Sequence, residues 1–513
     1  MKRYIVFLII FRITVIEKSF SQTIVYPVPV NFIHQLPIEQ ILNDSGYFTA
    51  SKPLMAVYDK NTHLPMYSYR FKESDTNRTR WLNKFTKEDL LKLDSSGYYL
   101  SLNPMMDFTA GIDNKFNTYY YNTRGIQIKG YVNKVSLYAI YTENQAGLPL
   151  YQHNYVKNGE IVLINNDSSY SRQTGYGMVQ GKGRSKPFKN KDRDFGYFQG
   201  QWVYSISSEL RVGMGYDKLF FGQGYRSILW SDFASPFPYA FLQYNKRKKW
   251  QYEFYAGQLL EGVRNKSLFT TAESYFFKKT FYIYHFQWHV GKNLTLSYFE
   301  KNFWMPSYFG SNNWMPEDYI PVPFYQIFRK NAFQRNIYTS SGAGLSYYLP
   351  SMKTIIFGQG LHSFQYAGNY AWQAGIKKFG NIWSIWAEYN HAYQSYYHEH
   401  HLNENIVHPF GPIFKEVVLG TLVNYRRWMC SIEYISGEFP YTNRLYLYEL
   451  SGYSTNQNLR KVMSWRGRSA FIVNPAYQWH LFIEILSRKA GNTKENYLMF
   501  GINTNLVVKN HLY

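Results

Sequence analysis

Hydrophobicity alternates with a period of two residues through most of this chain, and no other feature of the sequence restricts the fold as much. In the stretch 209–217, Leu210, Val212 and Met214 alternate with charged residues and glycines. The same alternation recurs in three further stretches, 250–257, 282–290 and 498–508. Because successive side chains of a β-strand point to opposite faces, each stretch predicts a strand with one apolar face and one polar face.

The apolar face of these strands is built mainly from aromatic side chains. Aromatic residues make up 20% of the 513 residues, including 51 Tyr and 13 Trp, whereas charged residues make up only 18%. Tyr and Trp are favoured where one end of a side chain meets lipid and the other meets water. A soluble β-sandwich shows the same alternation, but the aromatic face and the turn-rich loops between the stretches favour a membrane β-barrel. No later segment of the sequence approaches the ~20 consecutive apolar residues of a spanning helix.

We therefore predict an all-β fold, a transmembrane antiparallel β-barrel with a small N-terminal helical segment. The barrel is expected to occupy residues 98–513. At ~20–25 residues for each strand and its loop, this length gives roughly 16–18 strands. Several loops are long, and the long loops of outer-membrane barrels face outward. The longest predicted surface loops are 152–194, 302–336 and 390–412.

Residues 1–21 have the features of a signal peptide. Two basic residues precede the apolar stretch 4–11, and Ser19 and Ser21 are small residues placed as at a cleavage site. An exported chain with membrane strands and no spanning helix is expected in the cell outer membrane, as a multi-pass β-barrel.

The segment 22–97 is predicted to form an N-terminal arm and a short helical segment that is periplasmic or plug-like. One short helix is expected at 37–42. A second is expected at 80–93, because apolar residues recur at near-helical spacing from Trp81 to Leu93.

The formal net charge of the chain is +22. A basic balance favours nucleic acid, anionic lipid or an anionic polymer as partner. The export signal argues against nucleic acid, so the expected partners are outer-membrane lipid, including lipopolysaccharide, and an acidic surface polysaccharide. An alternative stays open, in which basic loops lie beside lipid phosphates and bind nothing specific.

The stretch 217–232 is the most informative segment for a functional site. It begins as an alternating strand and breaks at Gly222 and Gly224. Because glycine lets the chain turn sharply, we expect the segment to bend into the lumen, where any charge must be paired. Two interpretations stay open, a structural ion network and a binding site for an acidic glycan. The candidate residues are Arg124, Glu143, Asp217, Arg226, Ser227, Ser231 and Asp232.

Residues for metal binding or catalysis are harder to find. The histidine-rich stretch 398–401 lacks the spacing of a helical zinc motif, so we expect an exposed loop and no metal. A barrel hydrolase would need a nucleophile and an orienting acid beside His285 or His289. The sequence places Ser297 near them but fixes no such acid. We predict no cofactor and no enzyme activity.

Four stretches of the sequence form a recognisable set, 121–126 (YNTRGI), 142–145 (TENQ), 215–232 and 408–411 (HPFG). Together they resemble one family of Bacteroidota outer-membrane proteins, which comprises the Wzi-like capsule assembly proteins and the RemB-like gliding motility proteins. The resemblance covers the chain from about residue 80 to beyond 416, and it marks His408 and Gly411 as a loop motif. The sequence departs from the family pattern HPLGANF, because 408–414 reads HPFGPIF, and it has Phe233 where the family has Asn.

The resemblance implies a non-catalytic outer-membrane barrel, similar to a lectin, that attaches or assembles capsular polysaccharide at the cell surface. A second possible role is that of an accessory protein of gliding motility, with the gliding machinery as partner. A third, less favoured alternative is a barrel-embedded hydrolase of lipid or glycan.

Overall fold

We describe a computed structural model of the chain. It describes residues 80–504 except for 96, 116, 165–169, 190, 247–248, 266–275, 292, 305–319, 321, 326, 329–336, 365–368, 396–398 and 441–458, and before residue 80 only 24–28, 51–52 and 54–58. The predicted signal peptide, 1–21, and the predicted helix at 37–42 lie outside the described residues.

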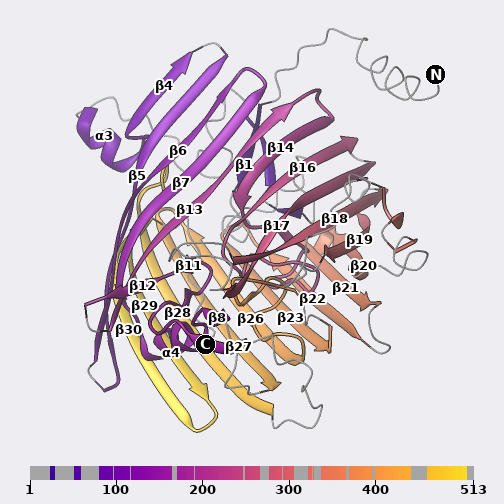
Figure 1. Ribbon diagram of the computed structural model, residues 1–513. Coiled ribbons are helices and arrows are strands. Elements are labelled where there is room, and N and C mark those ends of the chain that lie inside the picture. The colour runs from indigo at the N-terminus through magenta and orange to yellow at the C-terminus, as the bar shows by residue number, and fades with distance from the viewer. Residues whose placement is uncertain are drawn as a thin grey trace, which may run out of the picture.

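Eighteen antiparallel strands form a closed barrel (Figure 1). Closure is made by β30 and β5, which pair from Tyr497 opposite Asp113 to Asn503 opposite Asp107. The predicted fold class is therefore confirmed. The barrel strands are β5 (Tyr98–Asp113), β6 (Thr118–Val132), β7 (Val135–Gly147), β13 (Asp192–Ser205), β14 (Leu210–Asp217), β16 (Phe237–Lys246), β17 (Trp250–Asn265), β18 (Phe276–Val290), β19 (Leu294–Trp304), β20 (Ile337–Leu349), β21 (Thr354–Ser363), β22 (Tyr370–Phe379), β23 (Trp383–Tyr393), β26 (Phe414–Tyr425), β27 (Trp428–Pro440), β28 (Leu459–Asn474), β29 (Trp479–Ala490) and β30 (Thr493–Thr504).

The two ends of the barrel differ in the length of their connections. At one end, the short-turn end, neighbouring strands are joined by 133–134, 206–209, 247–249, 291–293, 350–353, 380–382, 426–427 and 475–478. At the other, the long-loop end, the connections include 148–191, 218–236, 305–336, 394–413 and 441–458. Short turns of outer-membrane barrels face the periplasm and long loops face outward. By this rule the short-turn end is expected to face the periplasm.

Apolar side chains point outward from the wall and polar ones point into the lumen. Met214, Trp288 and Phe500 are 51%, 51% and 55% exposed, whereas their neighbours on the other face, such as Arg211 and Gln287, are buried. The faces predicted from the alternating pattern are confirmed at these strands. Among the described residues, no helix has both the length and the hydropathy to cross a membrane.

The predicted helix at 80–93 is shorter than expected. Helix α3 (Arg80–Thr86) ends early, and the chain then forms strand β4 (Leu91–Ser95), which pairs with the start of β5. Leu91 and Leu93 thus belong to the sheet and not to a helix. The prediction of a helix at 91–95 failed because apolar residues in so short a stretch fit both the spacing of a helix and the alternation of a strand. Asn474 and Tyr477 at the short-turn end donate hydrogen bonds to backbone carbonyls of α3 and the turn that follows it.

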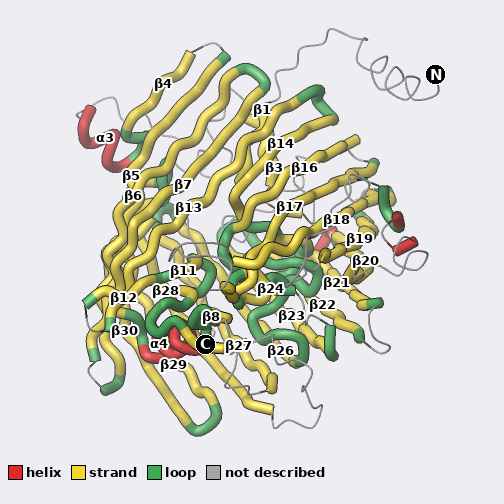
Figure 2. The backbone as a smooth tube through the Cα atoms, viewed as in Figure 1, coloured by secondary structure: helices red, strands yellow, loops and turns green. Residues whose placement is uncertain are grey.

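Two long-loop segments fold back into the lumen, 218–236 and the described residues of 394–413 (394–395 and 399–413), which we call the first and second lumen segments (Figure 2). Trp230 of the first segment is fully buried against the lumen-facing rings of Phe281 and Phe303, with centroids 5.0 and 5.9 Å away. Ile406 and Val407 of the second segment belong to the same apolar core.

Smaller elements accompany the two lumen segments. They are β1 (Ile24–Val28), β2 (Ser51–Lys52), β3 (Leu54–Tyr58), α4 (Leu150–Asn158), β8 (Val162–Ile164), β9 (Tyr170–Arg172), β10 (Met178–Val179), β11 (Gly183–Arg184), β12 (Lys186–Phe188), β15 (Phe220–Phe221), β24 (His400–His401) and β25 (Glu404–Asn405). The 3-10 turn Pro350–Met352 lies instead at the short-turn end, between β20 and β21. Strand β2 pairs with β15, whose two phenylalanines are buried in the lumen. Part of the predicted N-terminal arm therefore lies against the first lumen segment.

A charge on the outward face is expected to impair assembly. Phe286→Arg places a guanidinium in the lipid-facing band, at a cost of about 2–4 kcal/mol if the site lies near the bilayer midplane. Heat-modifiable migration on gels and the yield in outer-membrane fractions measure the effect. Phe286→Leu, which adds no charge, is the control and should assemble normally. Equal yields of the two variants would contradict the assignment of the outward face.

Candidate functional site

The first lumen segment enters the barrel through a glycine-dependent bend. Gly222 has φ +148°, and a Cβ atom there would lie 2.6 Å from Nε2 of Gln359 on the wall. At Gly224 a Cβ atom would lie 2.5 Å from the carbonyl oxygen of Arg226 and 2.7 Å from the carboxylate of Glu388. Both positions thus require glycine, and the predicted bend into the lumen is present.

Arg226 lies deep in the lumen and forms an ion pair with the wall. Its Nε stands 3.6 Å from Oε1 of Glu416 on β26, and both side chains are buried. The other oxygen of Glu416 is 2.8 Å from Nε2 of His408 in the second lumen segment. Burial lowers the pKa of His408, which favours its neutral form. One carboxylate therefore joins both lumen segments to the barrel.

A second carboxylate fixes the backbone of the same bend. Glu388 on β23 accepts hydrogen bonds from the backbone N–H groups of Tyr225, at 2.7 Å, and Arg226, at 2.9 Å. Asn390 lies between the two carboxylates and donates to Glu388 at 3.0 Å and to Glu416 at 2.9 Å. Arg226 is thus held by its side chain and by its backbone.

The other predicted residues of the 217–232 stretch have structural contacts. Asp217 accepts hydrogen bonds from the side chains of Tyr138 and Gln199 and from the backbone N–H of Lys218. The Ser227 hydroxyl donates to the carbonyl of Phe221 and accepts from backbone N–H groups that follow it.

Ser231 and Asp232 lie at the end of this segment. The Ser231 backbone N–H donates to the carbonyl of Ile406, at 2.8 Å, and thereby joins the two lumen segments. Asp232 is half-buried, and Lys218 donates to its backbone carbonyl at 3.1 Å. The ion partner of Arg226 is therefore Glu416 and not Asp232.

Arg124 and Glu143 do not belong to the lumen network. They lie opposite each other on β6 and β7, and both are exposed on the outward face. Their chain neighbours Thr123 and Asn144 point into the lumen and are buried. The predicted lumen position of Arg124 and Glu143 is therefore wrong. The reason is that both faces of β6 carry polar and aromatic residues, so its alternation does not identify the inner face.

The predicted loop motif joins the network. Gly411 has φ +80°, and its backbone N–H donates to the carbonyl of His408 at 3.1 Å, which closes a tight turn. The His408 ring stacks on Phe414 with centroids 3.7 Å apart. His408 and Gly411 therefore direct the chain from the second lumen segment back into β26.

The histidine-rich stretch is not an exposed loop, which corrects the expectation from sequence. Glu399 forms a buried ion pair with Lys301 of β19, and His400 pairs with Glu261 of β17. Lys279 of β18 stands 3.0 Å from the same Glu261. His398 lies outside the described residues. The charges of this stretch are stabilised in the lumen because the wall supplies opposite charges.

Glu404 connects three inward-folded parts of the chain. Its carboxylate accepts hydrogen bonds from the backbone N–H of Gly181, at 2.6 Å, from that of Ser235, at 2.9 Å, and from the Tyr155 hydroxyl, at 3.3 Å. Burial raises the pKa of Glu404. This residue carried no signal in the sequence, because an isolated glutamate in a polar loop is ordinarily solvated.

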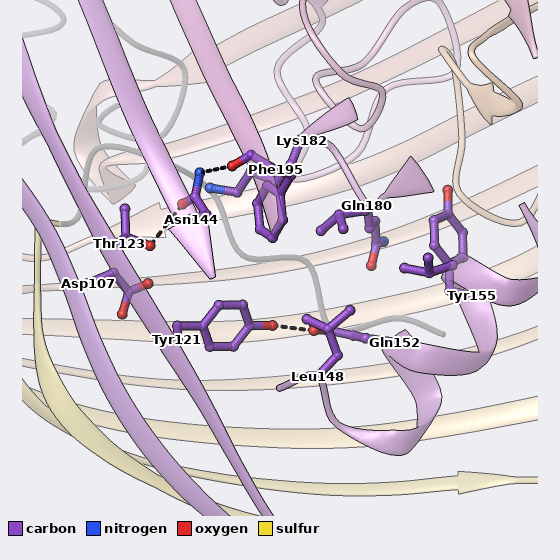
Figure 3. Close-up of a pocket in the computed structure, with 12 residues that line it drawn as sticks. Asp107, Tyr121, Thr123, Asn144, Leu148, Gln152, Tyr155, Gln180, Lys182 and Phe195 are labelled. Atoms are coloured by element: carbon purple, nitrogen blue, oxygen red, sulfur yellow. Dashed lines mark hydrogen bonds between the residues drawn. The ribbon is translucent and has the colours of Figure 1, made fainter. Parts of the chain in front are cut away.

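A pocket lies between α4 and the lumen face of the wall (Figure 3). The space in it that is open to water is about 30 Å³, room for about two water molecules, so a larger ligand requires the lining side chains to move. The wall contributes side chains from β5, β6, β7 and β13, and the inward-folded part of 148–191 contributes the rest. The lining residues are Asp107, Tyr121, Thr123, Asn144, Leu148, Gln152, Tyr155, Val156, Val179, Gln180, Lys182 and Phe195.

Gln180 is the polar side chain of this pocket with unused hydrogen-bonding capacity. It is 7% exposed, and both atoms of its amide group are buried without a hydrogen-bond partner among the described residues. By contrast, Asn144 accepts from Thr123 at 2.8 Å and donates to the carbonyl of Phe195 at 3.0 Å. A buried amide without partners costs free energy, so Gln180 is suited to bond a bound molecule.

Among the described residues, neither a metal centre nor a free position for His285 is found. Across the ranges given above, no group of three or more His, Cys, Asp or Glu side chains is arranged to hold a metal ion. His285 is buried, bonded to Glu253 at 2.8 Å, and packed edge-on against Phe221. This histidine therefore belongs to the lumen packing.

Comparisons with known proteins give only distant likenesses. No family model matches the sequence, and no curated protein matches it. Among solved structures the chain is similar to Wzi, an outer membrane protein involved in group 1 capsule assembly in Escherichia coli and a carbohydrate-binding β-barrel. The identity is 10% and the TM-score 0.46, over 77% of this chain and 84% of that chain. It is also similar to Pseudomonas aeruginosa OccK8 (OprE), with 9% identity and a TM-score of 0.41 over 78% and 97% of the two chains. A third similar structure is Pseudomonas aeruginosa OpdK with vanillate, with 7% identity and a TM-score of 0.42 over 79% of this chain and 98% of that chain.

Breaking the pair of Arg226 and Glu416 is expected to destabilise the folded lumen. Arg226→Ala and Glu416→Ala each leave a buried charge unpaired, which costs about 3–5 kcal/mol. The double variant should cost less than the sum, because it removes both charges. Denaturant unfolding of the refolded barrel measures the four free energies. Arg226→Ala combined with Asp232→Ala is the control, and its effects should be nearly additive. Additivity for Arg226 and Glu416 as well would contradict the pairing.

The second lumen segment is expected to loosen in acid through His401. Burial lowers the pKa of His401 to about 3, while its Nδ1 accepts the backbone N–H of Leu260 at 3.0 Å. The unfolded state binds a proton first, at a pKa of about 6.5. Stability therefore falls as the pH drops from ~6.5 towards ~3, by up to about 1.4 kcal/mol per pH unit. Hydrogen exchange of residues 399–411 at several pH values measures this loss. His401→Gln keeps an acceptor but cannot titrate, so its pH dependence should be weaker, and an unchanged slope would rule out His401 as the cause.

Proposed function

We propose that this protein is a non-catalytic outer-membrane β-barrel that binds surface polysaccharide and takes part in its attachment or assembly. One observation carries the proposal. The pocket at the long-loop half of the lumen combines aromatic rings, hydroxyls and amides, and Gln180 in it has buried amide atoms without a hydrogen-bond partner in the described part of the chain. Sugars offer hydroxyl groups for such amides and apolar C–H faces for such rings.

The resemblance found in the sequence supports the same site. Tyr121 and Thr123 lie in one of the four stretches that resemble the capsule assembly family, and Asn144 lies in another. All three line the pocket. The other two stretches form the network of Arg226 and His408, which fixes the lumen segments beside it. In this proposal the ion network is structural and the pocket binds the glycan.

The pocket lining holds one lysine and one carboxylate, Asp107, so it is the adjoining basic residues that favour an acidic glycan. Lys182 lines the pocket, with its ammonium group 4.8 Å from the centre of the Tyr197 ring. Further basic residues, Lys186, Lys189 and Lys191, are exposed on the adjoining hairpin that leads into β13. Such a field attracts an anionic polymer towards the long-loop end. A role in gliding motility rests only on the sequence resemblance and stays a prediction.

Replacing Gln180 is expected to weaken glycan binding without loss of the barrel. Gln180→Ala should reduce affinity for oligosaccharides released from the cell's own surface polysaccharide by about 10-fold, because one to two hydrogen bonds are lost. Calorimetry on the purified protein measures the affinity, and heat-modifiable migration reports on folding.

Gln201 provides the matched control. It is also a buried glutamine with unpartnered amide atoms among the described residues, but it lies on β13 outside the pocket. Gln201→Ala should bind the oligosaccharide like the unaltered protein. Equal binding by the unaltered protein, Gln180→Ala and Gln201→Ala would disprove a glycan site in this pocket. Binding by none of the three would disprove it as well.

A further inference from the structure

Three lysines stand together on the outward face of the last barrel strands, at the long-loop end. Lys489 of β29 and Lys494 of β30 are directly opposite each other, and both are exposed. Lys461 of β28 is exposed on the same face, two positions from Met463, which is the residue opposite Lys489. We call these three residues the lysine triad.

The lysine triad is not neutralised within the described part of the chain. None of its three ammonium groups lies within 4.0 Å of a described carboxylate. The neighbouring Glu495 points into the lumen, where it pairs with Arg488 at 3.4 Å. Glu438 on β27 lies opposite Lys461 of β28 on one side and opposite Lys415 of β26 on the other, so a single carboxylate stands between two lysines. Like charges directly opposite each other destabilise a sheet, so Lys489 and Lys494 favour an external anion between them.

The lysine triad lies just beyond the apolar band of the wall. On the same face, the next row holds Ser487 opposite Asn496, and the row after it holds Ile485 opposite Leu498. Ile485 is 58% exposed. Trp465, which is 53% exposed, lies opposite Ser487 on β28. Exposed Trp marks the boundary between hydrocarbon and headgroups in membrane barrels.

The hairpin of β29 and β30 therefore carries the lysine triad across this boundary. It forms the lowest part of the barrel wall in Figure 1, at the end opposite α3 and β4. Because this is the long-loop end, the triad lies at the headgroup level of the outer leaflet, with apolar wall directly on its membrane side.

We propose that the lysine triad binds the phosphate groups of a phosphorylated glycolipid of the outer leaflet, lipopolysaccharide. The two opposed ammonium groups contact oxygens of one phosphate, and the third lysine lies beside them for further phosphate or sugar oxygens. The acyl chains lie against the exposed Ile485, Leu498 and Trp465. The apolar wall below the triad is what favours a lipid over a soluble anion. This site is separate from the lumen pocket, and its occupancy does not depend on the proposed glycan binding.

The test uses the full-length barrel in nanodiscs that contain either diphosphorylated lipid A or the same lipid with its phosphates removed. The variant is Lys489→Gln with Lys494→Gln. The matched control is Lys246→Gln with Lys249→Gln, two exposed lysines at the short-turn end. The amount of labelled lipid A that stays with the detergent-extracted protein is measured, and heat-modifiable migration confirms folding.

We expect the Lys489 and Lys494 variant to bind phosphorylated lipid A about 30-fold more weakly, which corresponds to about 2 kcal/mol at ~1 kcal/mol per lysine. The control should bind as the unaltered protein does, and dephosphorylated lipid A should bind equally weakly to all. Equal retention of phosphorylated lipid A by the variant and the unaltered protein would overturn the proposal.

Two further outcomes also decide the matter. If the variant retains lipid A but loses an acidic oligosaccharide, the triad belongs to a polysaccharide surface and the lipid proposal is wrong. If the variant does not fold, the proposal is tested on the unaltered protein alone, by comparing its binding to the two forms of lipid A. The unaltered protein must prefer phosphorylated over dephosphorylated lipid A at least about 10-fold, as expected for charge-assisted phosphate contacts, and equal binding of the two lipids refutes the site.

Discussion

A strand that lies in lipid must find all its backbone hydrogen bonds within the protein, because hydrocarbon offers none. The pairing of β30 with β5 satisfies this requirement, since it joins the last strand to the first and leaves no open edge within the ring. Everything else in the structure depends on that closure. It separates an apolar outer surface from an enclosed lumen, and it makes each lumen-facing side chain a potential partner for any segment that folds inward.

The lumen is filled on the same principle that governs any protein interior. Apolar side chains of the first lumen segment, with Trp230 fully buried, pack against aromatic rings of the wall. Charged groups are paired with opposite charges, as in Arg226 with Glu416 and Lys301 with Glu399, or accept hydrogen bonds from neutral donors, as Glu404 does. Buried ion pairs contribute little net stability but are costly to break, so they fix which arrangement of the segments is formed. The second lumen segment in turn holds the inward-folded part of 148–191, which forms one side of the pocket, through the bonds of Glu404 to Tyr155 and Gly181.

The sequence predicted the architecture well because the alternating pattern is local. Each strand reports its own inner and outer face, as Met214 and Phe500 show, and the number of strands follows from length. The bend at Gly222 and Gly224 was also predictable, since glycine indicates a conformation that other residues rarely adopt. The pattern failed at Arg124, where the two faces of β6 have similar polarity and nothing in the strand itself distinguishes them.

The partners in the site were not predictable, for a physical reason. Arg226 and Glu416 are far apart in sequence, and so are Glu399 and Lys301. A charged residue at a lumen position of a strand has the same local pattern whether it faces water, a ligand or another charge. The amino-acid sequence by itself determined a closed barrel with an aromatic outer surface, a polar lumen and a segment that must turn inward. Only the tertiary structure decided which charges meet, that the histidine stretch is buried, and that the Gln180 amide finds no partner among the residues that the structure describes. These outcomes depend on closing the ring and bringing distant strands around the same enclosed space.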